Sequence, residues 1–589
     1  MKSILKYILI VTVLLGSVSC EDFLKEDPKG QLTSDKTFRN RDDLMGSLHA
    51  LYVAVRTANN GHIQFTFTNQ GDDLTTHPAM NKAVIREFDM SKVSNENSNM
   101  MNAISLWQWS WRTVKAANFI ITCPDNIPGA SVDDLNLVRG QAHFWRAWAY
   151  FMMVRVWGPL PIVEVVGADA NIQLSKISDV YEFIVADLKK AEGLTQATYP
   201  SPSYAMVGGV NIFAGKGAVQ ATLAQVYLTM GGWPLNYGTD YYKMAAAEAL
   251  KVINGGYYYE LYDDYAKIHS NAENRKNTEC VLGVYYDGGP NQTGDNGYCN
   301  RATIMDFPDF AGAWNDVSGE VKFYVNFPKG RRKDYTYSPV LVPGNSVTTA
   351  TPNGVPKPWW SGEIPIANRK PFSRKSAFMS FNHAQKDREY DVYQAFSLQD
   401  PAGWTVQTKQ IIRLAEVYLW YAEAVGRANL TDQNAKALEL LNAVRDRANG
   451  SVDPERGVYK NLSGESLAKA AWDEHGWEIA MWWGGPLAPR VMDQKRMHKV
   501  SGYYGVQEHY ESRKTEFAQQ LTHPIPESGE PLLLPDGTEI WDGKTVVRAG
   551  ESFGPVEPWN EEKMFSPYPK VDSDQIECFR NVDKFSLIK

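Results

Sequence analysis

Aromatic side chains in glycine- and proline-rich segments are the residues of this sequence whose types best suit a definite chemistry. Trp359 and Trp360 follow Pro-Lys-Pro and precede Ser-Gly, and Trp314 lies within Gly-Ala-Trp-Asn-Asp. A sugar ring has an apolar C–H face and an edge of hydroxyl groups, so flat aromatic surfaces flanked by fixed polar groups recognise it. These tryptophans are therefore candidate ligand contacts of a kind that suits a carbohydrate. Alternatively, the paired indoles pack onto helices and staple their loop.

A polar loop near the N-terminus supplies groups that suit the hydroxyl edge. It reads Asn-Gln-Gly-Asp-Asp-Leu-Thr-Thr-His and contains Asp72, Asp73 and His77, which we select as candidate ligand contacts. Aspartate, asparagine and glycine also form turns, and this is the alternative role of the loop. A basic run at residues 331–333 could meet an acidic glycan, although a run of charges is usually a solvated face.

One segment brings acids and a histidine together and so raises the question of catalysis. Residues 473–478 read Asp-Glu-His-Gly-Trp-Glu, and Glu474 and Glu478 share one face of the predicted helix. The spacing is not HExxH, so it implies no zinc site, and we expect the two glutamates to pair with Arg490 or Arg496. Glycoside hydrolysis needs two carboxylates about 5 to 9 Å apart, which a sequence cannot show. No GxSxG elbow, complete phosphate loop or EF-hand loop occurs, and we predict no enzyme activity, cofactor or catalytic metal.

The N-terminus has the layout of a bacterial secretion signal. Lys2 and Lys6 precede an apolar run of about nine residues, which is too short to span a bilayer that needs roughly 20. Small residues then lead to Cys20, as in a lipoprotein signal whose cysteine is lipidated after cleavage, although Ser17 stands where Leu is usual. We predict a membrane anchor of acyl chains on Cys20. The alternative is an ordinary cleaved signal with a chance cysteine.

Composition and charge exclude some partners. The chain is 43% hydrophobic and 22% charged, as in an ordinary folded protein, and its net charge of −8 disfavours nucleic acid. No later stretch has the length and apolarity of a transmembrane helix. Beyond Cys20 there are four cysteines, which allow three pairings, and buried free thiols are an equal alternative. They are Cys123, Cys280, Cys299 and Cys578.

Hydrophobic residues recur with helical period in segments that come in pairs. Ser131 and Asp134 form a capping signal before the longest segment, and Gly158-Pro159 ends it. Small residues at regular spacing would let antiparallel helices approach closely, as in stacked hairpins of the tetratricopeptide type, but no clean 34-residue period exists. The predicted helices contain residues 44–55, 104–121, 132–156, 181–191, 219–230, 242–253, 411–425 and 437–448.

Two blocks of the sequence resemble a known family. Residues 139–161 read RGQAHFWRAWAYF followed by VWGPLP, and residues 412–424 read IRLAEVYLWYAEA, with LLNAVR at 440–445. These blocks are similar to those of the SusD/RagB family, and residues 221–228, ATLAQVYL, resemble its third repeat. The late family block is matched only loosely at 477–480 and 490–496. The closing PIP segment has two candidates, at 523–526 and 566–569.

This resemblance implies a mostly α fold of about four tetratricopeptide-like hairpins with long irregular, aromatic-rich insertions. It also implies a surface-exposed lipoprotein of the outer membrane, held through Cys20, that binds an oligosaccharide and delivers it to a SusC-like TonB-dependent transporter without catalysis. Some relatives take up peptides, and this is the main alternative; a surface glycoside hydrolase is a further one.

The chain is accordingly divided into five parts. Residues 1–19 are the signal peptide and 20–36 the lipidated tether. Residues 37–256 form an N-terminal helical region with three repeat units. Residues 257–405, which lack helical periodicity and are rich in Gly, Pro, Asn and aromatics, form a variable ligand-binding insertion. Residues 406–589 hold the fourth unit and an irregular C-terminal segment.

Overall fold

The computed structural model of the protein describes a large part of the chain after the predicted tether. The described residues are 37–59, 72–76, 102–167, 171–199, 206–207, 210–269, 277–285, 318–319, 321–328, 330–338, 340–341, 357–358, 372–373, 408–449, 459–480, 489–511, 522–523, 546–547 and 558–589. Cys20 and Cys299 lie outside these residues, so the predictions on them are not tested here by structure.

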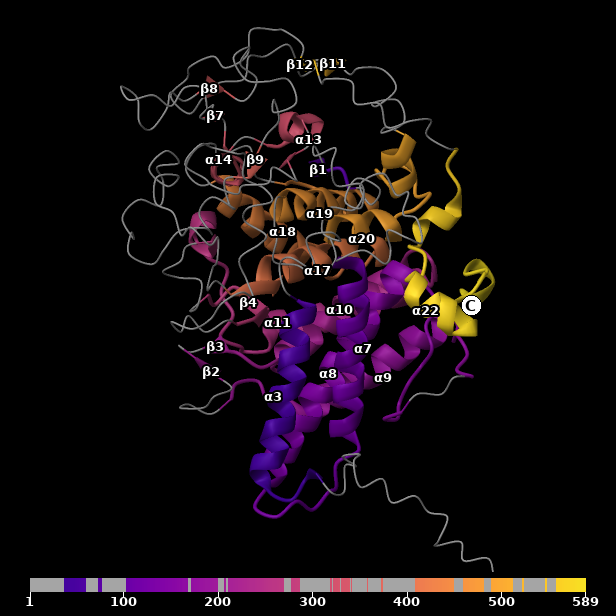
Figure 1. The fold of residues 1–589 in the computed structure, drawn as a ribbon. Helices are drawn as coiled ribbons and strands as arrows, with labels where there is room; N and C mark the ends of the chain where they lie inside the picture. The colour runs from indigo at the N-terminus through magenta and orange to yellow at the C-terminus, as the bar shows by residue number, and fades with distance from the viewer. Residues whose placement is uncertain are drawn as a thin grey trace, which may run out of the picture.

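The described part is mostly helical, as predicted, and a helix occurs in every segment that the periodicity selects (Figure 1). The four predicted pairs of helices are, in chain order, α3 (Arg41–Ala58) with α7 (Asn102–Ile121), α8 (Val132–Trp157) with α9 (Ile177–Leu194), α10 (Lys216–Gly231) with α11 (Thr239–Asn254), and α17 (Leu414–Ala428) with α18 (Asn434–Asn449). The remaining α-helices are α13 (Val321–Asn326), α14 (Arg331–Thr336), α19 (Gly464–Ile479), α20 (Pro489–Arg496) and α22 (Lys570–Gln575).

Short strands and 3₁₀ helices complete the described elements. The strands are β1 (Thr75–Thr76), β2 (Met206–Val207), β3 (Val210–Asn211), β4 (Cys280–Val284), β5 (Ser318–Gly319), β6 (Tyr337–Ser338), β7 (Val340–Leu341), β8 (Lys357–Pro358), β9 (Phe372–Ser373), β10 (Lys409–Arg413), β11 (Thr522–His523) and β12 (Val546–Val547). The 3₁₀ helices are η1 (Tyr265–His269), η5 (Glu561–Met564), η6 (Glu577–Phe579) and η7 (Phe585–Leu587).

One predicted helix boundary is wrong. Ile411 belongs to β10, and the helix begins only at Leu414. β10 pairs antiparallel with β4, with Ile412 opposite Leu282, and every residue of both strands is buried. The apolar residues of β10 are only Ile411 and Ile412, and two adjacent apolar residues have no period of their own, so they were assigned to the helical pattern that follows them.

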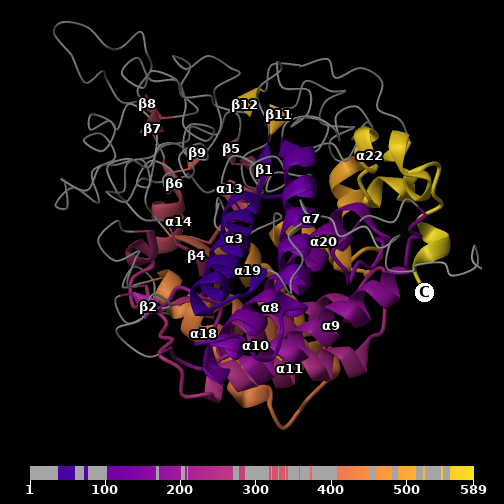
Figure 2. The ribbon, with the colours of Figure 1, turned by 60° about the horizontal axis from the view of Figure 1, so that its bottom comes forward.

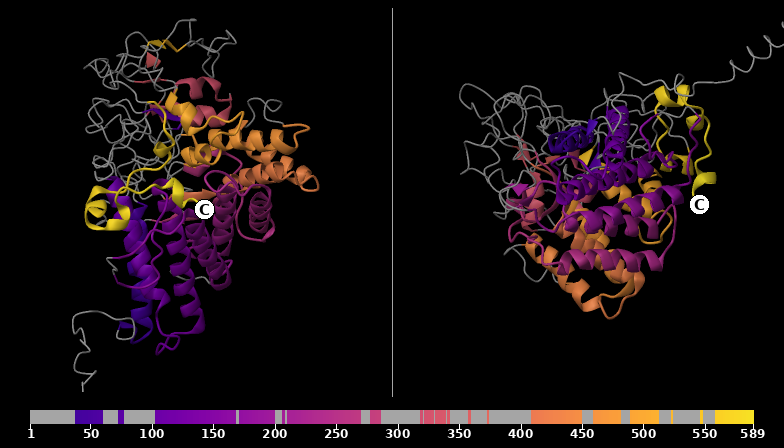
Figure 3. Two further views of the ribbon diagram at one scale, coloured as in Figure 1. Left: turned by 90° about the vertical axis from the view of Figure 1, so that its right-hand side faces the viewer. Right: turned by 90° about the horizontal axis from the view of Figure 1, so that it is seen from below.

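The helices form a stack of antiparallel hairpins. α3 packs on α7, α8 on α9, α10 on α11 and α17 on α18. Contacts between α7 and α8, between α9 and α10, and between α11 and α17 join the hairpins into one body. The last of these contacts is formed although residues 255–413 separate the two helices in sequence. The left view of Figure 3 shows the resulting order, from the first hairpins at one end to α17–α20 farther up.

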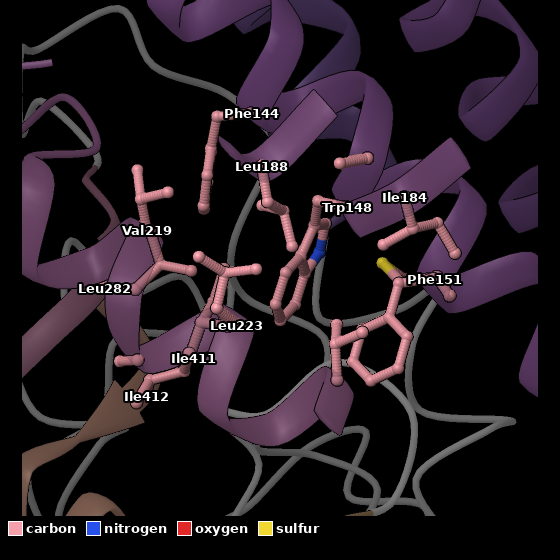
Figure 4. Close-up of a cluster of buried hydrophobic side chains, with 14 of the residues drawn as sticks. Phe144, Trp148, Phe151, Ile184, Leu188, Val219, Leu223, Leu282, Ile411 and Ile412 are labelled. Atoms are coloured by element: carbon pink, nitrogen blue, oxygen red, sulfur yellow. The ribbon is translucent and has the colours of Figure 1, made fainter. Parts of the chain in front are cut away.

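α8 is the central helix of this body, and the prediction that it packs on two sides is confirmed. Its N-terminus has the predicted capping box: the Ser131 hydroxyl accepts from the Asp134 N–H, and the Asp134 carboxylate accepts from the Ser131 N–H. Its end is at Gly158, whose φ of 84° suits glycine. The central aromatics face apolar side chains of α9, α10, β4 and β10 (Figure 4). These residues are Phe144, Trp148, Phe151, Ile184, Leu188, Val219, Leu223, Leu282, Ile411 and Ile412.

Glycine permits the closest approach between helices of the fourth unit. A Cβ atom on Gly426 of α17 would lie 2.6 Å from the Ala468 nitrogen and 2.6 Å from the Gly464 oxygen, both backbone atoms of α19. Backbone atoms cannot rotate away as a side chain can, so a larger residue would have to push α19 outward.

We therefore expect Gly426→Ala to lower the free energy of unfolding by about 1 to 3 kcal/mol. The matched control is Gly46→Ala in α3, where no atom lies within 4 Å of the added Cβ. There alanine should stabilise the helix by up to about 1 kcal/mol. Chemical denaturation of both variants measures the two changes. Equal effects at the two sites would show that the α17–α19 approach is not a tight constraint.

Candidate functional site

The early polar loop and the insertion meet at one end of the helical body. β1 of the early loop pairs antiparallel with β5, so that Thr75 lies opposite Gly319. β5 contacts β9, which pairs with β6 directly after α14. Figure 1 shows β1 and β7–β9 beyond α19, on the side away from the first hairpins, and Figure 2 shows β5 and β6 in a row with β1 and β9. We call this set of strands the loop end of the molecule.

A small hydrophobic cluster supports the loop end. Leu74 of the early loop packs with Tyr265 and Ile268 of η1, Tyr335 of α14 and Ile479 of α19. All five side chains are buried. These residues come from four separate parts of the sequence, so their burial fixes the early loop against both the insertion and the fourth repeat unit.

The two candidate aspartates of the early loop carry structural bonds. The Asp72 carboxylate is buried and accepts from the Leu74 N–H at 3.0 Å, which is the turn role given above as its alternative. Asp73 accepts from Nε and Nη2 of Arg490 at 2.7 and 2.9 Å, in a bidentate pair. The Arg490 guanidinium also lies 3.7 Å from the centre of the Trp472 ring. Contact of either aspartate with a ligand stays a prediction.

The other candidate contacts lie outside the described residues, although their chain neighbours do not. His77 follows β1 directly, and Trp314 precedes β5 by three intervening residues. Trp359 and Trp360 follow β8, which pairs with β7. The structure thus brings the strands that flank all of these candidates to the loop end.

Glu474 and Glu478 lie in a buried ion network rather than at an open site, whereas Asp473 is partly exposed and pairs with Lys469. Arg332 of α14 contacts Glu474 and Glu478 through Nη1, at 2.7 and 2.8 Å. Arg413 of β10 contacts Glu478 at 2.5 Å, and Arg447 of α18 contacts the same carboxylate at 2.6 Å. All of these side chains are almost completely buried. The three arginines hold the pKa of Glu478 near 2 against the opposing effect of burial.

The network extends to Glu279, which lies just before β4. Its carboxylate contacts Arg447 at 2.8 Å and Arg413 at 3.1 Å. The predicted partners of Glu474 and Glu478 were therefore wrong, because Arg490 pairs with Asp73 and Arg496 with Glu423 and Asp493. Proximity along the chain suggested the wrong arginines, whereas the true partners come from distant elements that fold against α19.

The basic run at residues 331–333, in α14, is not a solvated face. This corrects the expectation that such a run of charges lies in solvent. Arg331 forms a bidentate pair with Asp264, at 2.7 and 2.6 Å. Arg332 is buried in the network, and Lys333 is buried with its Nζ donating to the Phe327 carbonyl at 3.1 Å. The run therefore fixes α14 to its neighbours.

His475 also has a structural position. Its Nδ1 lies 2.5 Å from Asp493, and its Nε2 lies 3.3 Å from Glu416. Burial by itself would lower the pKa of His475, but the two carboxylates raise it to about 9. A histidine that is charged and enclosed by acids cannot accept a proton from a substrate at neutral pH. The acid–histidine segment thus serves the fold.

The possible metal ligands and the cysteines of the described part of the chain bear on metal and thiol chemistry. No group of three or more His, Cys, Asp or Glu residues there could hold a metal ion. Among the described cysteines, Cys123, Cys280 and Cys578 are all free, which agrees with the unpaired alternative. Within the same residues, no helix has the length and apolarity needed to cross a bilayer.

The sequence analysis did not select Arg413, Arg447 or Glu279. These residues form ion pairs that fix the insertion to the helical body. One signal was present. Arg413 is the last residue of β10 and stands between Ile411-Ile412 and Leu414-Ala415, and a charge among apolar residues requires a buried partner. The sequence could not indicate which of its 68 acids supplies that partner.

His475 makes a contribution to stability with a defined pH dependence. Its pKa is raised from 6.5 to about 9, so the contribution is complete below pH 6.5 and is lost as the pH rises to about 9. The shift corresponds to about 3 kcal/mol. The difference in unfolding free energy between pH 6 and pH 9 should therefore be smaller in His475→Gln than in the wild type.

Lys495 also changes stability with pH, because burial lowers its pKa to about 7 and the protein gains stability from this group as the pH rises. Since both proteins contain Lys495, the comparison of His475→Gln with the wild type isolates the effect of His475. His49→Gln, which changes an exposed histidine of α3, is the control and should retain the wild-type dependence. Parallel pH curves for all three proteins would contradict the assigned role of His475.

Comparison with known proteins gives a consistent result. A family model described as "Starch-binding associating with outer membrane" matches residues 22–228, and the model of the SusD family matches residues 311–484. SusD-like protein P2 of Formosa agariphila is 25% identical over 80% of this chain and 88% of its own length. A SusD-like protein of Bacteroides ovatus is 24% identical over 96% of this chain and 95% of its own.

Solved structures share the fold. A structure described as containing a xylogluco-oligosaccharide has a TM-score of 0.63 at 19% identity, covering 90% of this chain and 98% of its own. A laminarin-binding SusD-like protein has a TM-score of 0.58 at 19% identity, covering 81% and 94%. The two family matches together span more than half of the sequence, and the stacked hairpins and the order of the sequence blocks agree with them. This chain therefore belongs to the SusD/RagB family.

Proposed function

We propose that this protein is a surface-exposed lipoprotein of the outer membrane that binds an oligosaccharide and passes it, unchanged, to a SusC-like TonB-dependent transporter. The observation that carries the proposal is the meeting of β1 with β5 at the loop end. This pairing joins the early loop, with its polar candidates, to the insertion, with its tryptophans. A ligand site built from both segments needs such a junction.

The support beneath the loop end suits a binding site. The Leu74 cluster, the Asp73–Arg490 pair and the buried network around Glu478 fix the early loop, η1 and α14 to the fourth repeat unit. A site on a fixed base loses less conformational entropy when ligand binds. We propose residues 257–405 as the variable segment that selects the ligand.

The ligand class rests on two arguments. The loop-end candidates Trp314, Trp359 and Trp360 are tryptophans, whose flat faces suit sugar rings. Two solved structures of the same fold are described with a xylogluco-oligosaccharide and as laminarin-binding. Peptide is the alternative ligand. Catalysis has no support from the acid–histidine segment, whose carboxylates are committed to arginines.

The ligand proposal is tested by calorimetric titration of the protein begun after Cys20, with a panel of plant, host and microbial oligosaccharides. We expect a saturating heat for one class of glycan and at least tenfold weaker binding for Trp359→Ala combined with Trp360→Ala, because the sugar loses its stacking surface. Tyr241→Ala, which alters a partly buried aromatic residue of α11 on the helical body, should bind as the wild type does.

Each contrary result has a definite meaning. Heat that continues after every injection would signal turnover and contradict the non-catalytic proposal. Binding of peptides in place of glycans would replace the ligand class. Glycan binding that survives loss of both tryptophans would move the site away from them.

Anchoring through Cys20 gives an independent prediction. The full-length protein should partition into the outer-membrane fraction and incorporate a labelled fatty acid, because acyl chains on Cys20 hold it there. Cys20→Ala should lose both properties, whereas Cys578→Ala, at a partly buried free cysteine, should keep them. Fractionation and acyl labelling of the three proteins measure this. Membrane retention of Cys20→Ala would favour an anchor of another kind.

A further inference from the structure

Three cationic side chains meet where the C-terminal residues cover the end of α8. Arg155 lies in the last turn of α8, Lys495 lies in α20, and Lys584 directly precedes η7. Lys495 Nζ donates to the Arg155 carbonyl at 3.1 Å, and Lys584 Nζ donates to the Ser566 carbonyl at 2.6 Å. The Ser566 N–H in turn donates to the Val156 carbonyl at 2.8 Å. In Figure 1 the C-terminal residues, in yellow, lie beside α20. We call Arg155, Lys495 and Lys584 the basic cluster.

The charge of the basic cluster is not balanced by acids. No aspartate or glutamate oxygen of the described residues forms a salt bridge with any of the three cations. Eight arginines are more than nine-tenths buried in this part of the chain, and all except Arg155 pair with a carboxylate. The acid that acts on Arg155 from a distance is Asp493, and that carboxylate is already engaged by His475 and Arg496.

The neutral partners of the basic cluster compensate only part of this charge. Arg155 Nε donates to the Phe151 carbonyl at 2.9 Å, and its guanidinium lies 3.7 Å from the centre of the Phe151 ring. Lys584 Nζ lies 3.9 Å from the centre of the Tyr568 ring. The C-terminus of α8 supplies the equivalent of about half a negative charge. When all three groups are protonated, they therefore share much less than one unit of opposite charge.

Burial makes this excess costly. It lowers the pKa of Lys495 to about 7, with the charge of Arg155 as a second cause, and it lowers the pKa of Arg155 to about 10. The pKa of Lys584 also falls well below its ordinary value, through burial and then through repulsion by Lys495. A buried charge is stable when it is paired and hydrogen-bonded, and a lysine ammonium has three donors, of which one is used in each lysine here.

We propose that the basic cluster is a binding site for a small inorganic oxyanion, phosphate or sulfate. Its oxygens would accept from the free donors of the two lysines and from the guanidinium of Arg155, and its charge would balance the cluster. Because Arg155 and Lys495 are more than nine-tenths buried, the cluster favours a free ion over a sulfate ester carried by a sugar. The ion would join α8, α20 and the C-terminal residues, independently of glycan binding at the loop end.

The test uses the protein begun after Cys20, in a chloride buffer without phosphate or sulfate. Titration calorimetry with inorganic phosphate and with inorganic sulfate should give a saturating heat at one ion per chain. Lys495→Met and Lys584→Met should each weaken this binding at least tenfold. Both variants remove a charge and keep an unbranched side chain, so at least one should fold in the absence of the ion. The control, Lys436→Met, alters an exposed lysine of α18 that pairs with Glu439 and should bind as the wild type does.

Thermal unfolding at constant ionic strength gives a second readout. Phosphate and sulfate stabilise many proteins through exclusion from their surface, so the proposal requires a rise in Tm that is larger in the wild type than in Lys495→Met and Lys584→Met. An equal rise in all proteins, or the absence of a saturating heat with both ions, would overturn it. Binding of glucose 6-sulfate at the cluster without binding of inorganic sulfate would also overturn it, in favour of an esterified ligand. None of these outcomes affects the glycan proposal.

Discussion

The buried ion network around Glu478 is the interaction on which the arrangement of the loop end depends. It contains Glu279 before β4, Arg332 of α14, Arg413 of β10 and Arg447 of α18. Two of these elements belong to the insertion and the others to the fourth repeat unit or the strand before it. Removing one partner of a buried pair leaves an uncompensated charge and costs roughly 3 to 5 kcal/mol, far more than loss of a surface pair. The network thus fixes the start of the insertion, and α14 within it, to a rigid core.

The helical body and the described parts of the insertion differ in what holds them together. The hairpins are held by apolar contacts that run through α8, and β4, with Val281, Leu282 and Val284, is the strand of the insertion that joins this core. The insertion has its own small cluster around Leu74 and Tyr265, and it meets the helices through charges at α14 and α19. Residues beyond these anchor points need not contribute to the core. Ligand selectivity can therefore reside in the loops without a cost to the fold.

The prediction of the fold from sequence was largely correct, and its errors have a common cause. Helices α3, α7 to α11, α17 and α18 follow from local hydrophobic period, and the Ser131–Asp134 cap follows from a three-residue spacing. β10 was misread because strand pairing with β4 is not a local property. At the candidate site the sequence selected an early polar loop and aromatic segments of the insertion as candidates. The strands next to its candidates do meet at one end, and Asp72 has the turn role given as its alternative, but the pair of Asp73 with Arg490 was not foreseen.

The sequence by itself determined the pairs of helices, the family and the segments that contain the candidate ligand contacts, because each depends on residues close together along the chain. Only the tertiary structure decided the partners of the charged side chains. Asp73 and its partner Arg490 are 417 residues apart, and the partners of Glu478 come from three other elements. Charge complementarity acts between any acid and any base that folding brings within a few ångströms, so it leaves no period or spacing in the sequence.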